Sequence, residues 1–384
     1  MSYGYAVEFL KGSLEKYTPS RSESSLAIAL KEKCIDELGF EEAYIDSVGN
    51  MIAIKGSGEP KILLCGHMDT VPGSIPVRIQ DGFIYGRGAS DAKAPLISML
   101  LAASEFPKQR GTIIFAAVVD EEGNATGIKH LVSRNLDVNY AIFGEPSGID
   151  KITIAYKGRV AIRLVCDVKN SAHASAPWLA RNSIEEMSAL WNELRAELCE
   201  RESPTGGSDS VTCAITEIEG GTSHNVTPQR CKATIDIRIP VRTTCDEILA
   251  RVDSVVNRVS KSKGSVIKYR TEDRTEPFEA EIRSVLVRAL SLSIMDICKI
   301  RPLLIRKTGT GDMNILGNAL KMPAVTYGPG DPHSSHTTNE RIKIQEYISS
   351  IEIYTRALFH ISRIHHLKKD LHLEQDIKEQ DNTR

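Results

Sequence analysis

The sequence has little of several features that would point to other classes of protein. It has no apolar run long enough to span a membrane, and acidic side chains between Met1 and Glu15 interrupt what could be a signal-peptide core. The formal net charge is only -2, which leaves little basic excess to neutralise phosphates. The eight cysteines are dispersed and include no Cys-x-x-Cys pair. We therefore expect a soluble, cytoplasmic protein with no nucleic-acid or membrane partner.

The first part of the chain predicts an α/β domain. With 384 residues the chain exceeds the usual size of a single core, which favours two domains. Apolar strands alternate with helices here, an order typical of a mixed, largely parallel sheet with helices on both faces. The pattern predicts helices over 23–38 and 95–105, and strands over 44–54, 61–65, 112–119 and 140–143.

The pattern changes after residue 157. Strands are predicted over 160–169, 211–219, 231–239 and 266–269, and helices over 183–199 and 246–259. This βαββαβ order is that of a ferredoxin-like α+β unit. We therefore predict an inserted domain over 157–272 and a discontinuous catalytic domain over 1–156 and 273–384. The charged stretch 365–384 is expected to be a frayed helical extension without a chemical role.

Potential metal ligands are scattered along the chain, and the first four closely follow apolar runs that predict strands. They are His67, Asp91, Glu122, Glu145 and His336. The carboxyl ends of strands at one edge of a sheet would bring these donors together. Imidazole and carboxylate suit zinc or a related divalent ion, and one acid too many for a single tetrahedral ion suggests two ions that share a bridging carboxylate. The leading hypothesis is a dinuclear metallohydrolase.

Most of these residues also have an ordinary structural interpretation. His67 alone would more often be a buried structural histidine, but Asp69 could accept from its second ring nitrogen and fix its tautomer. The alternative for Asp69 is a turn cap. Asp91 precedes a predicted helix and could be its N-cap, and Glu145 could be an exposed acid. The ligand interpretation depends on all the acids being present together.

Glu121 and Glu122 follow the predicted strand over 112–119 as an adjacent pair. Adjacent buried carboxylates repel each other unless a cation or proton intervenes. A metal-held water ionises near neutrality and supplies a nucleophile without any serine or cysteine. We expect Glu122 to coordinate metal, and Glu121 to take the proton of that water and deliver it to the leaving amine. The opposite assignment of the pair remains open.

Two later segments offer further site residues. The loop 307–312 is rich in small residues, and its Gly309 and Thr310 could hold a carboxylate through backbone N–H groups and a hydroxyl, although a flexible turn is the alternative. Near the C-terminus both His333 and His336 could bind metal, and we favour His336.

The predicted inserted domain contributes polar candidates of its own. His173 could donate to the oxyanion of a tetrahedral intermediate, with Asn225 assisting, although each could equally be a loop contact. Arg238 could clamp a substrate carboxylate with two hydrogen bonds, or merely pair with Asp236.

Several motifs together carry a family resemblance. In chain order, the segments 66–72, 86–93, 120–123, 144–146, 173–182 and 220–228 resemble motifs of the acetylornithine deacetylase, succinyl-diaminopimelate desuccinylase and carboxypeptidase family of dizinc amidohydrolases. The resemblance spans nearly the whole chain except the tail. It implies one zinc bound by His67, Asp91 and Glu145, another bound by Asp91, Glu122 and His336, and Glu121 as the acid/base. It also implies a homodimer formed through the inserted domain, with His173 reaching the partner's active site.

Within that family, the segments 86–93 and 307–314 look most like hydrolases that release lysine or ornithine from an amino-group carrier protein in lysine and arginine biosynthesis. The implied substrate is an amide between the γ-carboxyl of the carrier's terminal glutamate and the α-amino group of the amino acid. The alternatives are a deacylase or dipeptidase acting on small N-acyl amino acids or dipeptides, and a non-catalytic carboxylate-binding scaffold. Two zinc ions are expected, with cobalt as a substitute that accepts the same ligands.

Overall fold

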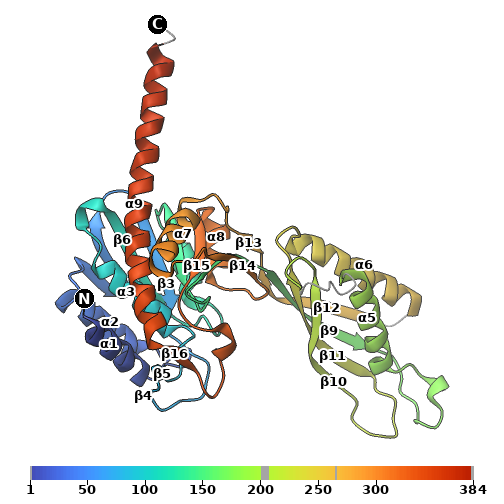
Figure 1. The fold of residues 1–384 in the computed structure, drawn as a ribbon. Coiled ribbons are helices and arrows are strands. Elements are labelled where there is room, and N and C mark those ends of the chain that lie inside the picture. Colours follow the sequence, from blue (N-terminus) through green and yellow to red (C-terminus); the bar gives the residue numbers. More distant parts are fainter. Residues whose placement is uncertain (1, 200–206, 264–265, 382–384) are drawn as a thin grey trace. The chain divides into compact units, whose positions relative to one another are not determined.

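The computed structural model describes residues 2–199, 207–263 and 266–381, and Figure 1 shows their fold. Over these residues the chain forms two compact units. The first unit comprises 1–154, 280–305 and 315–384, and the second comprises 155–279 and 306–314. The second unit thus takes in a short segment beyond the 157–272 expected from the sequence. Asn314 contributes to this, because its side-chain amide donates to the backbone oxygens of Lys157 (3.1 Å) and Glu276 (2.9 Å).

The main sheet is mixed and has a parallel centre. Among the described residues its strand order is β1-β2-β6-β3-β7-β15-β8-β13, and β14 also pairs with β8. The central strands β6 (Gly111–Val118), β3 (Lys61–His67), β7 (Tyr140–Gly144) and β15 (Ala324–Tyr327) run parallel. The outer strands are β1 (Glu42–Ile45), β2 (Met51–Ser57), β8 (Lys151–Tyr156), β13 (Phe278–Glu279) and β14 (Leu303–Lys307). The predicted α/β class with a largely parallel sheet is confirmed.

The single strand predicted over 44–54 is wrong, because β1 and β2 are separate antiparallel strands. Asp46 lies in the turn between them. Its Oδ1 accepts hydrogen bonds from the backbone N–H groups of Val48 (3.0 Å), Gly49 (3.0 Å) and Asn50 (2.9 Å). An aspartate that binds the backbone just ahead of it stabilises a turn, which interrupts the strand.

Helix α3 (Lys93–Ser104) forms the centre of the helical layer. Nearly all its residues are buried, because it packs against β3, β6 and β7 and also against α9 (Ile344–Asp381). A helix enclosed in this way has no polar face. The other helices of this part are α1 (Tyr3–Glu15), α2 (Ser24–Asp36), α4 (Thr126–Ser133), α7 (Val285–Cys298) and α8 (Asp312–Leu320). A small sheet contains β4 (Arg78–Gln80), β5 (Phe83–Tyr85) and β16 (Arg341–Lys343).

Helix α9 includes the described part of the charged tail as a continuous helix (Figure 1). No helix in the described part of the chain combines the length and the apolar character needed to cross a membrane.

The second unit has the predicted βαββαβ order. Its elements are β9 (Gly158–Asp167), α5 (Ser183–Leu198), β10 (Thr212–Gly220), β11 (Arg230–Ile239), α6 (Cys245–Lys263) and β12 (Val266–Thr275). The strands form an antiparallel sheet in the order β10-β11-β9-β12, so the first and third strands are central, as in ferredoxin-like units. Alternate residues of β11, such as Ile235 and Ile237, are buried in a core shared with Leu190 of α5 and Val252 of α6. This burial explains the period of two in the sequence.

Candidate metal centre

Neighbouring strands of the main sheet end at the same edge and carry most of the predicted ligands. His67 is the last residue of β3, Glu122 follows shortly after β6, and Glu145 comes directly after β7. The loop after β15 leads to His336. Asp91 does not follow a strand of the main sheet, since it lies between β5 of the small sheet and the start of α3. The expected gathering at strand ends therefore applies to the main-sheet ligands, and Asp91 joins them at the amino end of a buried helix.

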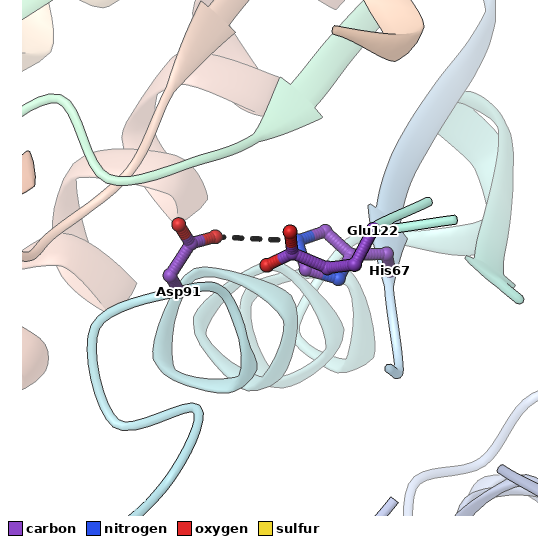
Figure 2. Close-up of side chains that lie close together, drawn as sticks. All are labelled: His67, Asp91 and Glu122. Carbon is purple, nitrogen blue, oxygen red and sulfur yellow. Dashed lines mark hydrogen bonds and ion pairs between the residues drawn. The ribbon is translucent and has the colours of Figure 1, made fainter. Parts of the chain in front are cut away.

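The five predicted ligands lie side by side in the first unit. His67 Nε2 is 3.3 Å from Asp91 Oδ1 and 3.6 Å from Glu145 Oε1. His336 Nε2 is 2.7 Å from Glu122 Oε1 and 3.4 Å from Asp91 Oδ2. Ligand atoms of His67, Asp91 and Glu122 all lie within 4.8 Å of one another, and Figure 2 shows these three side chains converging. The two oxygens of Asp91 thus face different imidazoles, which divides the donors into two sets that share Asp91.

The donor set fits divalent cations. Carboxylates of Asp91, Glu122 and Glu145 are largely buried, with side-chain exposures of 15%, 12% and 18%. Burial raises the pKa of Glu122 and the charge of Asp91 adds to this rise, although His67 and His336 oppose it. A cation among these groups would offset both the burial and the repulsion. Imidazole nitrogen and carboxylate oxygen are donors that zinc and its neighbours accept.

Asp69 connects the ligands of two strands. It is fully buried, and its carboxylate accepts hydrogen bonds from the backbone N–H groups of Glu121 (3.1 Å) and Glu122 (3.0 Å) and from the Ser20 hydroxyl (2.7 Å). Its Oδ1 also lies 3.4 Å from His67 Nδ1. One carboxylate therefore fixes the backbone of the acidic pair and also faces the ring of His67.

The tautomer of His67 follows from its partners. Nδ1 lies 2.9 Å from the backbone oxygen of Asp69, and because that oxygen can only accept, Nδ1 donates. Nε2 is the nitrogen that faces Asp91 and Glu145. Burial lowers the pKa of His67, but hydrogen bonds to Asp69 and Asp91 outweigh this and raise the pKa well above its ordinary value. A metal bound at Nε2 would require this nitrogen to be without its proton.

The turn after β6 directs the acidic pair. Asp120 has a φ of 59°, in the left-handed region that non-glycine residues seldom adopt. Its N–H donates to Glu23 Oε1 (3.0 Å), and its backbone oxygen accepts from Ala125 N–H (2.7 Å). These hydrogen bonds stabilise the turn at Asp120. The N–H groups of the next two residues, Glu121 and Glu122, can then donate to the Asp69 carboxylate.

The two C-terminal histidines lie in different surroundings. His336 has a φ of 63° and is 51% exposed at its side chain, so it covers the cluster from the solvent side. His333 belongs to the short 3-10 helix Pro332–Ser334 and lines a different pocket with Phe83 and Lys343. The geometry is consistent with our preference for His336.

The remaining predicted site residues lie in the second unit. His173 is exposed, and its Nδ1 is hydrogen-bonded to the Ser175 hydroxyl at 2.8 Å. Asn225 lies beside it, since the Ala174 N–H donates to the Asn225 backbone oxygen at 2.8 Å. His173 and Asn225 therefore lie in two neighbouring loops of the second unit, one after β9 and the other between β10 and β11.

Arg238 and Thr310 are brought together near the other end of β11. Arg238 Nη1 donates to Thr310 Oγ1 at 3.4 Å, and Arg238 Nε donates to Asp236 Oδ1 at 2.6 Å. The pairing with Asp236 that we considered as an alternative is therefore present. A Cβ atom added at Gly309 would meet no heavy atom within 4 Å, so the backbone at this position is open to a small group.

The structure adds two residues near the centre that sequence patterns did not identify. Lys93 is completely buried, and its ammonium donates to the backbone oxygens of Ser13 (3.3 Å) and Lys16 (2.6 Å). Glu340 is also completely buried and accepts from the N–H of Asp91 at 2.9 Å. No local pattern could reveal Glu340, because its partners lie about 250 positions away in the sequence.

Solved structures of other proteins share the fold of this chain. A tripeptidase structure from Staphylococcus aureus superposes with a TM-score of 0.81 at 22% identity and covers 94% of this chain and 99% of that chain. The structure of a Bacillus subtilis protein described as a dinuclear metal binding peptidase superposes with a TM-score of 0.72 at 14% identity, covering 94% and 98%. At these identities the likeness establishes the fold alone.

The sequence comparisons define the family. The model for peptidase family M20/M25/M40 matches residues 63–360, and the chain belongs to this family. A Thermococcus kodakarensis protein, provisionally assigned as a LysW-lysine/LysW-ornithine hydrolase, is 37% identical over 90% of this chain and 89% of its own length. A Saccharolobus islandicus protein named LysW-lysine/LysW-ornithine hydrolase is 31% identical, over 92% and 95%. The chain is thus a hydrolase of the amide-bond class, in a metal-dependent family, with a candidate metal site.

Proposed function

We propose that this protein is a dizinc amidohydrolase that frees lysine, and also ornithine, from the terminal glutamate of an amino-group carrier protein. The observation that carries the metal chemistry is the position of Asp91, whose two oxygens face His67 and His336 separately. The substrate is supported by the relatives, which are named for hydrolysis of LysW-lysine and LysW-ornithine and align over most of both chains.

In this proposal each ligand set has a distinct place. His67, Asp91 and Glu145 would hold one cation, and Asp91, Glu122 and His336 would hold the other. When bound, the cations would polarise the amide carbonyl and lower the pKa of a water. Zinc is the proposed metal, and cobalt would be accepted by the same donors.

The proton transfer is assigned to Glu121. Its backbone is fixed by Asp69, while its side chain is close enough for its charge to raise the pKa of His67. The Glu121 carboxylate takes a proton from the attacking water and gives it to the leaving amine. Asp69 holds His67 in the Nδ1–H tautomer and keeps Glu121 in place.

The second unit is proposed to recognise the substrate. His173 and Asn225 would donate hydrogen bonds to the oxyanion. Arg238, Thr310 and the backbone of Gly309 would bind the carboxylate of the released amino acid. This unit would also form the homodimer interface, and a single particle at the mass of one chain in light scattering would contradict that part of the proposal.

The test of the chemistry uses two isosteric variants that serve as controls for each other. Glu121→Gln is expected to keep its metal content and lose turnover, because only the proton acceptor is removed. Glu122→Gln is expected to lose metal occupancy, because an amide oxygen is a weaker ligand than a carboxylate. Metal content by atomic emission and turnover are measured on both, and the reverse result would exchange the two roles.

The test of the substrate compares carrier-bound lysine with N-acetylornithine and simple dipeptides, all with the zinc-loaded protein. Release of free lysine from the carrier with little cleavage of the small substrates is expected. Cleavage of the small substrates alone would reject the carrier protein as the substrate and indicate a deacylase or dipeptidase. The proposed metal chemistry would be unaffected by that result.

A further inference from the structure

Glu340 and Arg87 form a buried ion pair directly behind Asp91, the ligand that the two proposed metal sites share. Glu340 is 0% exposed, and its Oε1 accepts hydrogen bonds from the N–H groups of two consecutive residues, Ser90 and Asp91, both at 2.9 Å. Its Oε2 accepts from Arg87 Nη1 at 2.8 Å. Both oxygens of this carboxylate are therefore used, and one of them fixes the backbone of Asp91 itself.

The same pair also reaches the segment that carries His336. Arg87 Nη1 donates to the backbone oxygen of Thr337, the residue after His336, at 3.0 Å, and Arg87 Nε donates to the backbone oxygen of Gly73 at 2.8 Å. The Gly86 N–H donates in turn to the Glu340 backbone oxygen at 3.2 Å. The loop that carries Asp91 and the loop that carries His336 are far apart in the sequence, and the pair connects them at or next to these two ligand residues.

Asp69 provides a comparison within the same unit. It too is a buried carboxylate that accepts from two consecutive N–H groups, those of Glu121 and Glu122. Each carboxylate is therefore bonded to the backbone of one ligand loop. Hydrogen bonds to an ionised acceptor are stronger than neutral ones, and in a dry interior they fix the backbone closely.

We propose that Glu340, paired with Arg87, is a positioning residue that sets Asp91 and His336 in the relation needed for both oxygens of Asp91 to meet a cation. This inference rests on the metal centre of the proposed function. It predicts that Glu340 governs metal affinity through the backbone of Asp91, without contacting metal or substrate. Partners of this kind behind metal ligands commonly change affinity when they are replaced.

The test is Glu340→Gln. Glutamine has nearly the same shape, but its NH2 must face either Arg87 or the two backbone N–H groups, which places donors against donors. We expect the affinity for zinc at the weaker of two sites to fall about 10–100-fold, measured by competition with a chromophoric chelator. Arg87→Lys, which keeps the charge but loses the planar fork, is expected to shift the affinity in the same direction by a smaller factor. If Glu340→Gln does not fold, the zinc affinity of Arg87→Lys alone tests the positioning role.

The matched control is Asp46→Asn. Asp46 also accepts from consecutive backbone N–H groups, but it lies in the β1–β2 turn at the edge of the main sheet. This variant is expected to lower the melting temperature and leave zinc affinity unchanged. If Glu340→Gln and Arg87→Lys behave in the same way as the control, the pair only stabilises the fold and the positioning role is overturned. A wild-type protein that binds no zinc would instead overturn the metal centre itself, so the two failures are distinguishable.

Discussion

The substitution Asp69→Asn would test how much the stability and the zinc affinity of the candidate metal centre depend on one buried carboxylate. Asp69 accepts from the N–H groups of Glu121 and Glu122 and from the Ser20 hydroxyl, and it faces the ring of His67. Asparagine keeps the shape but has only one acceptor oxygen. Its NH2 group must therefore point at one of the two backbone N–H groups or at the protonated Nδ1 of His67.

The expected cost follows from these contacts. A hydrogen bond to a charged group contributes about 1.5–3 kcal/mol, and a buried donor left without a partner costs about 1–3 kcal/mol. Losing one such bond and leaving one N–H unsatisfied should together lower the free energy of unfolding by about 2.5–6 kcal/mol. Because the backbone of Glu121 and Glu122 would move, zinc affinity should also fall about 10–100-fold.

The pH dependence gives an independent check. Burial tends to raise the pKa of Asp69, but its bonds to His67, Ser20 and Glu121 outweigh this and lower it. The stability from this carboxylate is therefore present above its unfolded pKa of about 3.9 and is lost as pH falls through the lower folded value. Urea unfolding of Asp69→Asn and wild type at pH 7 and in acid, together with zinc titration, measures both effects. An unchanged urea midpoint and unchanged zinc affinity at pH 7 would refute the reasoning.

Two further perturbations test the interior and the metal. Burial lowers the pKa of Lys93 to about 7. Since its unfolded pKa is about 10.4, the unfolded chain binds more protons between these values, and wild-type stability should rise with pH relative to Lys93→Met. A stability difference that stays constant in urea unfolding at pH 7 and pH 9.5 would argue against a displaced titration. Removing metal with a chelator should lower the melting temperature in calorimetry, because a ligand at 100 times its Kd adds about 2.7 kcal/mol. Recovery on adding zinc is expected, and a melting temperature insensitive to both treatments would speak against a bound cation.

Much of the fold could be predicted from periodicity because burial imposes it. A strand with one buried face, such as β11, alternates, and the buried centre of β3 is a continuous apolar run. The strand expected over 44–54 was wrong because the turn depends on Asp46 binding nearby backbone N–H groups, which an apolar pattern does not record. Sequence patterns did not identify Lys93 for a related reason, since a lysine is ordinarily solvent-exposed and the two backbone oxygens that accept its hydrogen bonds lie near the end of α1, far away in the sequence.

The sequence by itself determined which donors are present and in what order. Imidazole and carboxylate groups placed just after apolar strands are enough to predict a metal-binding edge, because parallel strands end together. Only the tertiary structure decided which atoms face one another. That Asp91 presents one oxygen to His67 and the other to His336, with Glu340 behind its backbone, depends on packing between segments about 250 residues apart. Contacts at such separations arise from the shape of the folded core, and no local pattern in the chain encodes them.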